Sequence, residues 1–332
     1  MKQMSTMLFF WSLTFGACGQ EWHTVDSSDG SRPDARHESA FTAVGNFLVL
    51  AGGRGIKPVN LFDPQYGRWL TGARTAMELH HFQGVEVDGV LWAVGAFTGG
   101  YPDETPLPHA WSYDPEGDRW RQGPAIPADR RRGSAGAVAV DGQIYIAGGA
   151  TEGHRGGHVS WLDRFDPATG AWLRLKDAPR PRDHAALVAL DGKLYFVGGR
   201  LSMAPDNTFR AVVPEVDVYD IASDTWTTLA QPLPNPRAGI AAAAYNGWVY
   251  VMGGESGATE AAFETVDRLD VATGTWQSAP PLRRGRHGTG AAVLDGQLWV
   301  ASGSGARGGG PELDDLETLA ENVPGAVTLP SK

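Results

Sequence analysis

The chain has 332 residues, of which 42% are hydrophobic and 12 are tryptophan, so it holds enough apolar side chain for a large packed core. Glycine (44) and proline (22) make up about a fifth of the chain, below the share typical of low-complexity disorder. The formal net charge of −10 argues against a nucleic-acid-binding protein, because such proteins neutralise phosphates with a basic surface. The single cysteine, Cys18, excludes an intramolecular disulfide and a zinc site built from cysteines.

The chain opens with an apolar run over residues 7–17. This run is shorter than the roughly 20 residues of a membrane-spanning helix, but its length is typical of the apolar region of an export signal. Gly16 and Ala17 then precede Cys18, an order that resembles the bacterial lipobox, in which the cysteine is lipidated after cleavage. We expect a signal peptide over 1–17, cleaved before Cys18, and an exported protein anchored by lipid in the cell envelope, periplasmic or surface-exposed. An ordinary signal peptide and a disordered apolar start are the alternatives.

A unit of about 50 residues then recurs along the chain, a period typical of repeat architectures. Most copies begin with an arginine, and a glycine pair or a close variant follows sixteen residues later. In most copies an Asp-Gly or Asn-Gly dipeptide stands seven residues before that pair. Further on, an aromatic residue or leucine followed by aspartate precedes a tryptophan. The copies begin near Arg36, Leu79, Arg132, Arg182, Arg237 and Arg286, with Leu79 in place of the arginine.

Each unit is expected to form four antiparallel strands. Short apolar runs flank the Asp-Gly dipeptide, which is the strongest signal for a two-residue hairpin turn. The return strand, for example 144–147, is rich in β-branched and aromatic residues and ends at the glycine pair. A loop, a third strand and a fourth strand carrying the tryptophan follow. Four such strands per unit form one blade of a β-propeller, so we predict a single all-β domain over 18–332.

The ends of the chain indicate how the ring closes. Five complete units run from Arg36 to Trp276, whereas the sixth begins at Arg286 and contains no tryptophan. The missing tryptophan stands near the other end, at Trp22. We therefore predict six blades, with the strand around Trp22 as the outer strand of the last blade, which removes an open sheet edge.

These motifs resemble the kelch repeat: the Asp-Gly turn, the tyrosine before a double glycine, and the spaced Tyr-Asp-Pro and Trp. The resemblance extends from about Trp22 to about Thr318 and implies a six-bladed kelch-type β-propeller, of the broader galactose oxidase-like class. Gly95-Ala96 and Ser302-Gly303 depart from the double glycine, so we expect blades two and six to be less regular.

The loops after the second strands of the blades are long, and they share one face of a four-stranded meander. They cover 97–111, 150–161, 200–216 and 255–265. Long loops on a rigid scaffold commonly carry function, so we expect the ligand to bind on this face near the central channel. The opposite face has only short Asp-Gly and Asp-Pro turns.

Candidate binding residues lie at the starts of the innermost strands and directly after the glycine pairs. Two roles are open for the repeated arginines. They form a cationic ring for an anionic ligand, as in the animal kelch adaptors that bind acidic peptides, or each ties its own blade to neighbouring carbonyls and carboxylates. Positions that break the repeat symmetry are further candidates. The predicted ligand-binding face comprises Arg36, Arg54, His80, His81, Phe97, Arg182, His184, Arg200, Arg237, Glu255, Arg286 and His287.

No catalytic motif in the sequence stands in the structural context that its chemistry needs. The string 303–308 fits a dinucleotide fingerprint, but the Gly-Gly-Pro that follows cannot open the helix that such a site needs. His154 and His158 have a metal-like spacing only on a helix, and they lie in a glycine-rich stretch. The cysteine–tyrosine cofactor of the kelch copper oxidases is excluded because Cys18 is the only cysteine. We therefore predict neither a metal nor a cofactor.

The sequence thus favours a non-catalytic kelch-repeat binding protein that recognises a protein or carbohydrate, an anionic ligand among them, on its long-loop face. No nucleic acid is expected as a partner, and contact with a membrane is expected only through the lipid on Cys18. The alternative is a carbohydrate-active enzyme similar to the bacterial sialic-acid mutarotases, a sugar mutarotase or epimerase. In that case Glu255, with a histidine or arginine, would supply acid–base catalysis.

Overall fold

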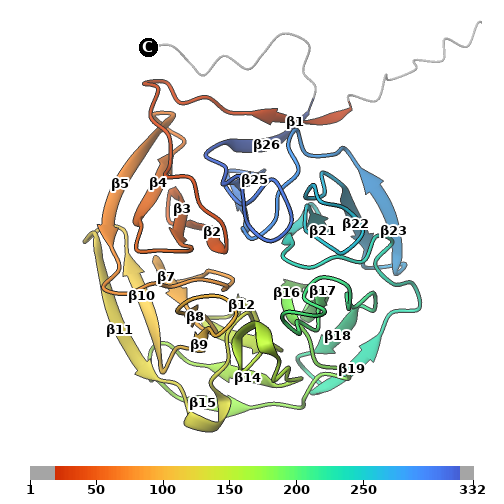
Figure 1. Ribbon diagram of the computed structural model, residues 1–332. Helices are drawn as coiled ribbons and strands as arrows, with labels where there is room; N and C mark the ends of the chain where they lie inside the picture. The colour runs from red at the N-terminus through yellow and green to blue at the C-terminus, as the bar shows by residue number, and fades with distance from the viewer. Residues whose placement is uncertain (1–18, 322–332) are drawn as a thin grey trace, which may run out of the picture.

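The computed structural model describes residues 19–321, which form six four-stranded antiparallel sheets arranged around a central channel (Figure 1). The prediction of an all-β, six-bladed propeller is confirmed. The expected signal peptide over 1–17 and Cys18 lie outside the described residues. No helix among residues 19–321 is long and apolar enough to cross a membrane.

Within each blade the strands follow one another from the channel outward. The first three blades consist of β2 (Ser39–Val44), β3 (Phe47–Gly52), β4 (Pro58–Asp63), β5 (Arg68–Arg74), β6 (Val85–Val87), β7 (Val90–Ala93), β10 (His109–Asp114), β11 (Arg119–Ala125), β12 (Gly136–Val140), β13 (Gln143–Ala147), β14 (Leu162–Phe165) and β15 (Trp172–Arg174). The last three consist of β16 (Asp183–Leu190), β17 (Lys193–Arg200), β18 (Asp217–Asp220), β19 (Thr225–Thr228), β20 (Ala241–Tyr245), β21 (Trp248–Met252), β22 (Val266–Asp270), β23 (Thr275–Ala279), β24 (Ala291–Leu294), β25 (Gln297–Ala301), β26 (Leu316–Glu321) and β1 (Gln20–Thr24). The loops carry β8 (Phe97–Thr98), β9 (Thr105–Pro106) and the 3-10 turns η1 (Ala128–Arg130) and η2 (Gly153–Arg155).

The hairpin turns have the backbone conformation that their sequences demand. In the Asp141-Gly142 turn both residues have positive φ, 50° and 73°, as a type I′ turn requires. Asp191-Gly192 has nearly the same values, 51° and 73°. In blade two the innermost strand, β6, has only three residues and is shorter than the innermost strands of the other five blades, so this blade departs from its neighbours as its sequence predicts.

The glycine pairs allow neighbouring blades to approach each other. Gly148 has φ 64°, and a Cβ there would lie 2.6 Å from the carbonyl oxygen of Arg182 in the next blade. The amide of Gly149 donates a 2.8 Å hydrogen bond to that same oxygen. In blade six Ser302 replaces the first glycine at φ 60°, and its hydroxyl donates to the carbonyl of Arg36. In the five blades other than blade two, the second residue of the pair donates its amide to the carbonyl of the residue that begins the next repeat, which explains the recurrence of the pair.

The repeated tryptophans lie directly opposite the aromatic or leucine residues of the third strands. The cross-strand pairs are Phe62↔Trp69, Tyr113↔Trp120, Phe165↔Trp172, Tyr219↔Trp226 and Leu269↔Trp276. Apolar side chains of adjacent blades pack against one another at all six blade interfaces. The core is therefore a ring of interfaces around the channel.

The N-terminal strand closes the ring as predicted. β1 pairs with β26 (Figure 1). The pairing places Trp22 opposite Leu319, so Trp22 completes the series of cross-strand pairs. Trp22 is 0% exposed, and its indole nitrogen donates a 3.0 Å hydrogen bond to the carbonyl of Pro280 in blade five. The outer strand of blade six thus comes from the opposite end of the described chain, and this blade has four strands like the other five.

We expect Trp22→Ala to lower the free energy of unfolding by about 3–5 kcal/mol, because it removes a fully buried side chain from the closing strand. Chemical denaturation followed by circular dichroism measures the change. Trp276→Ala is the matched control, since this half-buried tryptophan holds the same repeat position in a blade formed by one continuous segment. A loss for Trp22→Ala no larger than that of the control would contradict closure by β1.

Candidate functional site

The repeated arginines lie inside the blades. Arg36, Arg132, Arg182, Arg237 and Arg286 are each at most 2% exposed. Each guanidinium donates to the carbonyl sixteen residues further on, which belongs to Gly52, Gly148, Gly198, Gly253 or Ser302. The constant spacing of arginine and glycine pair in the sequence therefore reflects one hydrogen bond that recurs in five blades.

Each of these arginines also binds a polar side chain on the third strand of its own blade. Arg237 contacts Asp267 at 2.9 Å and Arg132 contacts Asp163 at 2.7 Å. The corresponding partners of Arg36, Arg182 and Arg286 are Asn60, Asp217 and Glu317. Removing one partner of such a buried pair leaves an uncompensated charge, which is strongly destabilising. This geometry favours the framework role of the arginines over a cationic ring for a ligand.

Backbone hydrogen bonds link the six blades around the channel. The residue two positions after the start of each repeat donates its amide to the equivalent carbonyl of the preceding blade, over 2.8–3.1 Å. Between the last and first blades the donor is the amide of Ser39, one residue later than in the other blades. It donates to the carbonyl of Gly288. We call the six residues of this ring the collar: Glu38, His81, Ser134, His184, Gly239 and Gly288.

All six collar residues have left-handed backbone conformation, with φ between 53° and 66°. Glycine adopts this conformation freely and is present in blades five and six. Glu38, His81, Ser134 and His184 adopt it at the energetic cost that a side chain brings. Such backbone strain is concentrated at functional sites in proteins, so these four side chains are candidates for function.

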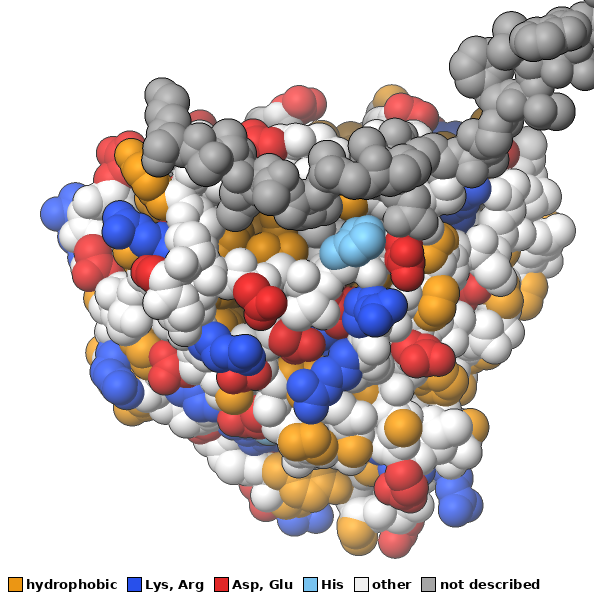
Figure 2. Space-filling view, turned by 90° about the horizontal axis from the view of Figure 1, so that it is seen from above, with side chains coloured by type: hydrophobic (Ala, Val, Ile, Leu, Met, Phe, Trp, Pro, Cys, Tyr) orange, Lys and Arg blue, Asp and Glu red, His pale blue; other side chains and the backbone are white. Residues whose placement is uncertain are grey.

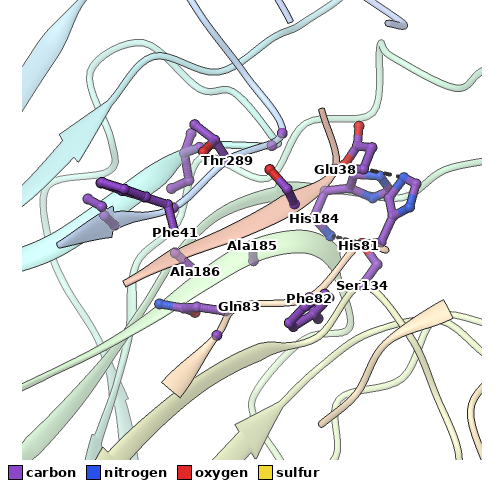
Figure 3. Close-up of a pocket in the computed structure, with 18 of the residues that line it drawn as sticks. Glu38, Phe41, His81, Phe82, Gln83, Ser134, His184, Ala185, Ala186 and Thr289 are labelled. Atoms are coloured by element: carbon purple, nitrogen blue, oxygen red, sulfur yellow. Dashed lines mark hydrogen bonds and ion pairs between the residues drawn. The ribbon is translucent and has the colours of Figure 1, made fainter. Parts of the chain in front are cut away.

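A cavity of about 340 Å³, which we call the mouth pocket, opens on the long-loop face above the collar. The loops of blades one, two, three, four, five and six all contribute to it. Its lining consists of His37, Glu38, Arg54, His81, Tyr101, His154, Arg200, Thr208, Phe209, Glu255 and Gly308. A smaller cavity of about 80 Å³ lies on the channel side of the collar, where Glu38, His81 and His184 lie close together at one end (Figure 3).

Two ion pairs organise the charged groups of the mouth pocket. Arg54 contacts Glu104 at 2.6 Å, and Arg200 contacts Glu255. Glu255 also accepts a 2.8 Å hydrogen bond from the amide of Gly308. Each arginine is therefore paired with a carboxylate. The wall of the pocket presents both hydrogen-bond donors and acceptors and carries no excess of positive charge.

Two aromatic residues from separate loops border the pocket. Tyr101 is 54% exposed, and its ring lies 5.1 Å from the ring of His154. Its hydroxyl lies 3.3 Å from the hydroxyl of Thr208. Phe209 is half-buried beneath the guanidinium of Arg200, 5.0 Å from the ring centre. The pocket therefore combines aromatic faces with paired polar groups.

The structure distributes the sequence-predicted residues among three environments. Arg54, His81, Arg200 and Glu255 line the mouth pocket. His80, Phe97, His184 and His287 lie buried around it, where His80 donates to the carbonyl of Gly99 and His287 to that of Ala306. The four predicted arginines at the starts of repeats are enclosed in the blades: Arg36, Arg182, Arg237 and Arg286.

Sequence reasoning missed Glu38, Tyr101, Glu104 and Phe209, and it considered His154 only as a metal-binding pair with His158, which it rejected. A signal for Glu38 existed, because it stands two residues after Arg36 just as His184 stands after Arg182. The other four lie in long loops that share no pattern between blades. No periodic signal in the sequence identifies them.

Glu255 is held as an anion. Burial raises its pKa, but the charges of Arg200 and His287 and the hydrogen bond from the Arg200 guanidinium outweigh that effect and lower the pKa to about 2. A carboxyl group with this pKa is ionised at neutral pH, so it is poorly suited to donate a proton.

Comparison with known proteins identifies the family. A family model described as the KLHDC2/KLHL20/DRC7 kelch-repeats domain matches residues 85–303. The chain belongs to the kelch-repeat family. It is 30% identical over 292 residues to the kelch-like protein terF of Aspergillus terreus, covering 81% of this chain and 61% of terF. The mouse kelch-like protein 35 is 27% identical over 269 residues, with 80% of this chain and 42% of that protein covered.

The kelch-repeat chain spans less than two thirds of the length of these relatives. Among solved structures, that of YjhT superposes with a TM-score of 0.71 at 17% identity, covering 86% of this chain and 95% of that one. At this identity the likeness shows the propeller fold alone.

The depressed pKa of Glu255 predicts an acid-sensitive contribution to stability. Its carboxyl group titrates near 4.5 when unfolded and at about 2 when folded, which corresponds to a contribution on the order of 3 kcal/mol. This stabilisation is fully present above pH 4.5 and is lost as the pH falls toward 2. We expect Glu255→Gln to be less stable than wild type at pH 7 and to lose less stability between pH 5 and 2.5.

Urea denaturation at a series of pH values measures this dependence. Glu264→Gln, which alters an exposed carboxyl group in the same loop, is the control and should follow the wild-type curve. Parallel pH curves for Glu255→Gln and wild type would rule out the stabilising role of the Arg200–Glu255 pair.

Proposed function

We propose that this kelch propeller is a non-catalytic binding protein that recognises a glycan through the mouth pocket on its long-loop face. Kelch-repeat propellers typically mediate protein interactions, and the fold here presents loops from all six blades to one cavity. The observation that carries the proposal is the lining of that cavity, with the exposed ring of Tyr101 beside two ion pairs.

The chemistry of the pocket favours a neutral polar ligand over an anion. Arg54 and Arg200 are each matched by a carboxylate, so neither offers an unpaired positive charge. Sugar rings present hydroxyl groups, which both donate and accept, and apolar C–H faces, which pack on aromatic rings. Both features match a pocket in which Tyr101 and Phe209 accompany paired polar groups. The other outcome of a binding screen, besides a glycan, is a protein partner that inserts a polar loop into the mouth pocket.

The surface charges support the absence of nucleic acid among the partners. On the side of the disc seen in Figure 2, Lys and Arg side chains alternate with Asp and Glu, and the formal net charge is −10. A sugar mutarotase is the less favoured function, because Glu255, its candidate acid–base group, is held as an anion by Arg200.

We further propose that the protein is exported and anchored in the cell envelope by a lipid on Cys18. The support is the order of the sequence alone: the apolar run over 7–17, the small residues Gly16 and Ala17, and then the only cysteine. This arrangement would place the propeller outside the cytoplasm, where glycans of the envelope are accessible.

Loss of an aromatic surface in the pocket is expected to weaken glycan binding. A glycan array probed with the full chain identifies a ligand, and calorimetry measures its affinity. We expect Tyr101→Ala and Phe209→Ala each to lower that affinity about tenfold or more, the usual effect of removing an aromatic contact at the centre of an interface.

Tyr66→Ala is the matched control. Tyr66 is 58% exposed, close to the exposure of Tyr101, but lies in the turn between β4 and β5 on the opposite face. This variant should bind as wild type does. Equal affinities for all three variants, or no glycan bound by the wild-type chain, would reject the proposed ligand site.

The lipid anchor is tested with Cys18→Ser in a bacterial host. Wild type should incorporate a clickable palmitate analogue and fractionate with membranes, whereas Cys18→Ser should remain unlabelled, because only a thiol accepts the first lipid. Ala17→Ser serves as control, since it keeps a small residue before the cysteine. Unlabelled wild-type protein would refute the anchor.

A further inference from the structure

Three buried histidines from three different blades meet between the mouth pocket and the channel. His81 precedes β6, His154 lies in η2 and His184 lies in β16. Their ring centres form a nearly equilateral triangle, with separations of 5.1, 5.0 and 4.9 Å. One ring nitrogen of each lies within 4.8 Å of the others. The three side chains therefore converge on one point.

Hydrogen bonds to the opposite side of each ring determine which nitrogen is left over. Nδ1 of His154 contacts Glu104 at 2.9 Å, and Nδ1 of His184 contacts Asp183. A carboxylate accepts hydrogen bonds, so in the neutral rings each Nδ1 carries the proton. Nε2 of both rings then carries a lone pair, which is the arrangement found in histidine–metal sites supported by carboxylates. That of His184 has no partner among residues 19–321, and that of His154 faces the Arg200 guanidinium at 3.5 Å.

The contact between His81 and His80 leaves Nε2 of His81 unprotonated as well. Nε2 of His80 lies 2.9 Å from the carbonyl of Gly99 and must donate, so Nδ1 of His80 accepts. Nδ1 of His81, at 2.6 Å from Nδ1 of His80, is therefore the donor, and Nε2 of His81 is left unprotonated. All three histidines thus offer Nε2 as a ligand atom.

Two further observations indicate that a cation belongs at this point. Nε2 of His184 is buried and has no hydrogen-bond partner among residues 19–321, which is costly in a protein interior. Nε2 of His81 lies 3.3 Å from a carboxylate oxygen of Glu38, so two lone pairs face each other.

The geometry points to a divalent transition-metal site, with zinc as the expected ion, held by Nε2 of His81, His154 and His184. Three imidazoles and one open position are typical of zinc sites that bind a further ligand. Zinc–nitrogen bonds of about 2.0–2.1 Å require the three nitrogens to close in by roughly 1–1.5 Å, which small side-chain rotations supply. Glu38 stands beside the open position, and the mouth pocket gives access, since His81 and His154 line it.

The surrounding charges are compatible with a metal ion. Arg200 lies 3.5 Å from Nε2 of His154, but its guanidinium is engaged by Glu255 and Ser202. Glu38, Glu104 and Asp183 add three carboxylates around the histidines. Binding requires the weak contact between Arg200 and His154 to lengthen, and leaves the ion pair of Arg200 in place.

The test uses the untagged full chain after removal of metals with a chelator. Calorimetry and elemental analysis after dialysis should give one Zn²⁺ per chain. Co²⁺ in its place should produce the intense visible bands of a four-coordinate site, and Mg²⁺ should not compete, because imidazole ligands select transition metals. Absence of stoichiometric Zn²⁺ binding by the wild-type chain would overturn the site, whatever the outcome of the glycan experiments.

Variants locate the ion. His81→Ala and His184→Gln should each weaken Zn²⁺ binding about 100-fold or more, and Glu104→Gln about 10–100-fold through the orientation of His154. His23→Ala, which alters a half-buried histidine of β1, is the matched control and should leave affinity unchanged. Melting curves in chelator verify that each variant is folded before titration. Undiminished binding by folded His184→Gln would place the ion elsewhere and refute the assignment.

Discussion

The pairing of β1 with β26 is the constraint on which the rest of the molecule depends. It joins the two ends of the described chain in one sheet and buries Trp22 between blades five and six. The collar shows the same closure at the channel, where the amide of Ser39 in the first blade binds the carbonyl of Gly288 in the last. Glu38 and His287 approach to 3.8 Å only because the ring is closed in this way.

The fold is predictable from sequence because each blade is built from local contacts that recur. The separation of Arg182 and Gly198 along the sequence is set by one hydrogen bond within a blade, from the guanidinium of Arg182 to the carbonyl of Gly198. The separation of Tyr219 and Trp226 along the sequence is set by the tight turn that joins their two paired strands. A recurring contact of this kind imposes a recurring spacing, so the blade count and even the origin of the closing strand can be inferred from residue positions alone.

The candidate site is predictable only where it belongs to the repeat. His81 and His184 occupy collar positions, so their place near the channel follows from the spacing. Tyr101 and His154 lie in loops whose lengths and sequences differ from blade to blade. Their approach to 5.1 Å depends on how two separate loops fold against each other, and no local pattern encodes that contact. Burial of the repeated arginines was likewise left open by sequence, because one spacing suits a framework contact and a binding ring equally.

The collar explains how a symmetric scaffold acquires an asymmetric site. Its six backbone hydrogen bonds are nearly equivalent and require a residue that tolerates left-handed φ at each position, rather than one particular side chain. Glycine fills two positions on one side of the channel, whereas Glu38, His81 and His184 fill three others. The polar groups of the channel are consequently gathered on one side of the ring, beneath the loops that carry Arg54 and Arg200. Because the hydrogen bonds of the collar come from the backbone, the side chains of Glu38, His81 and His184 are available for recognition.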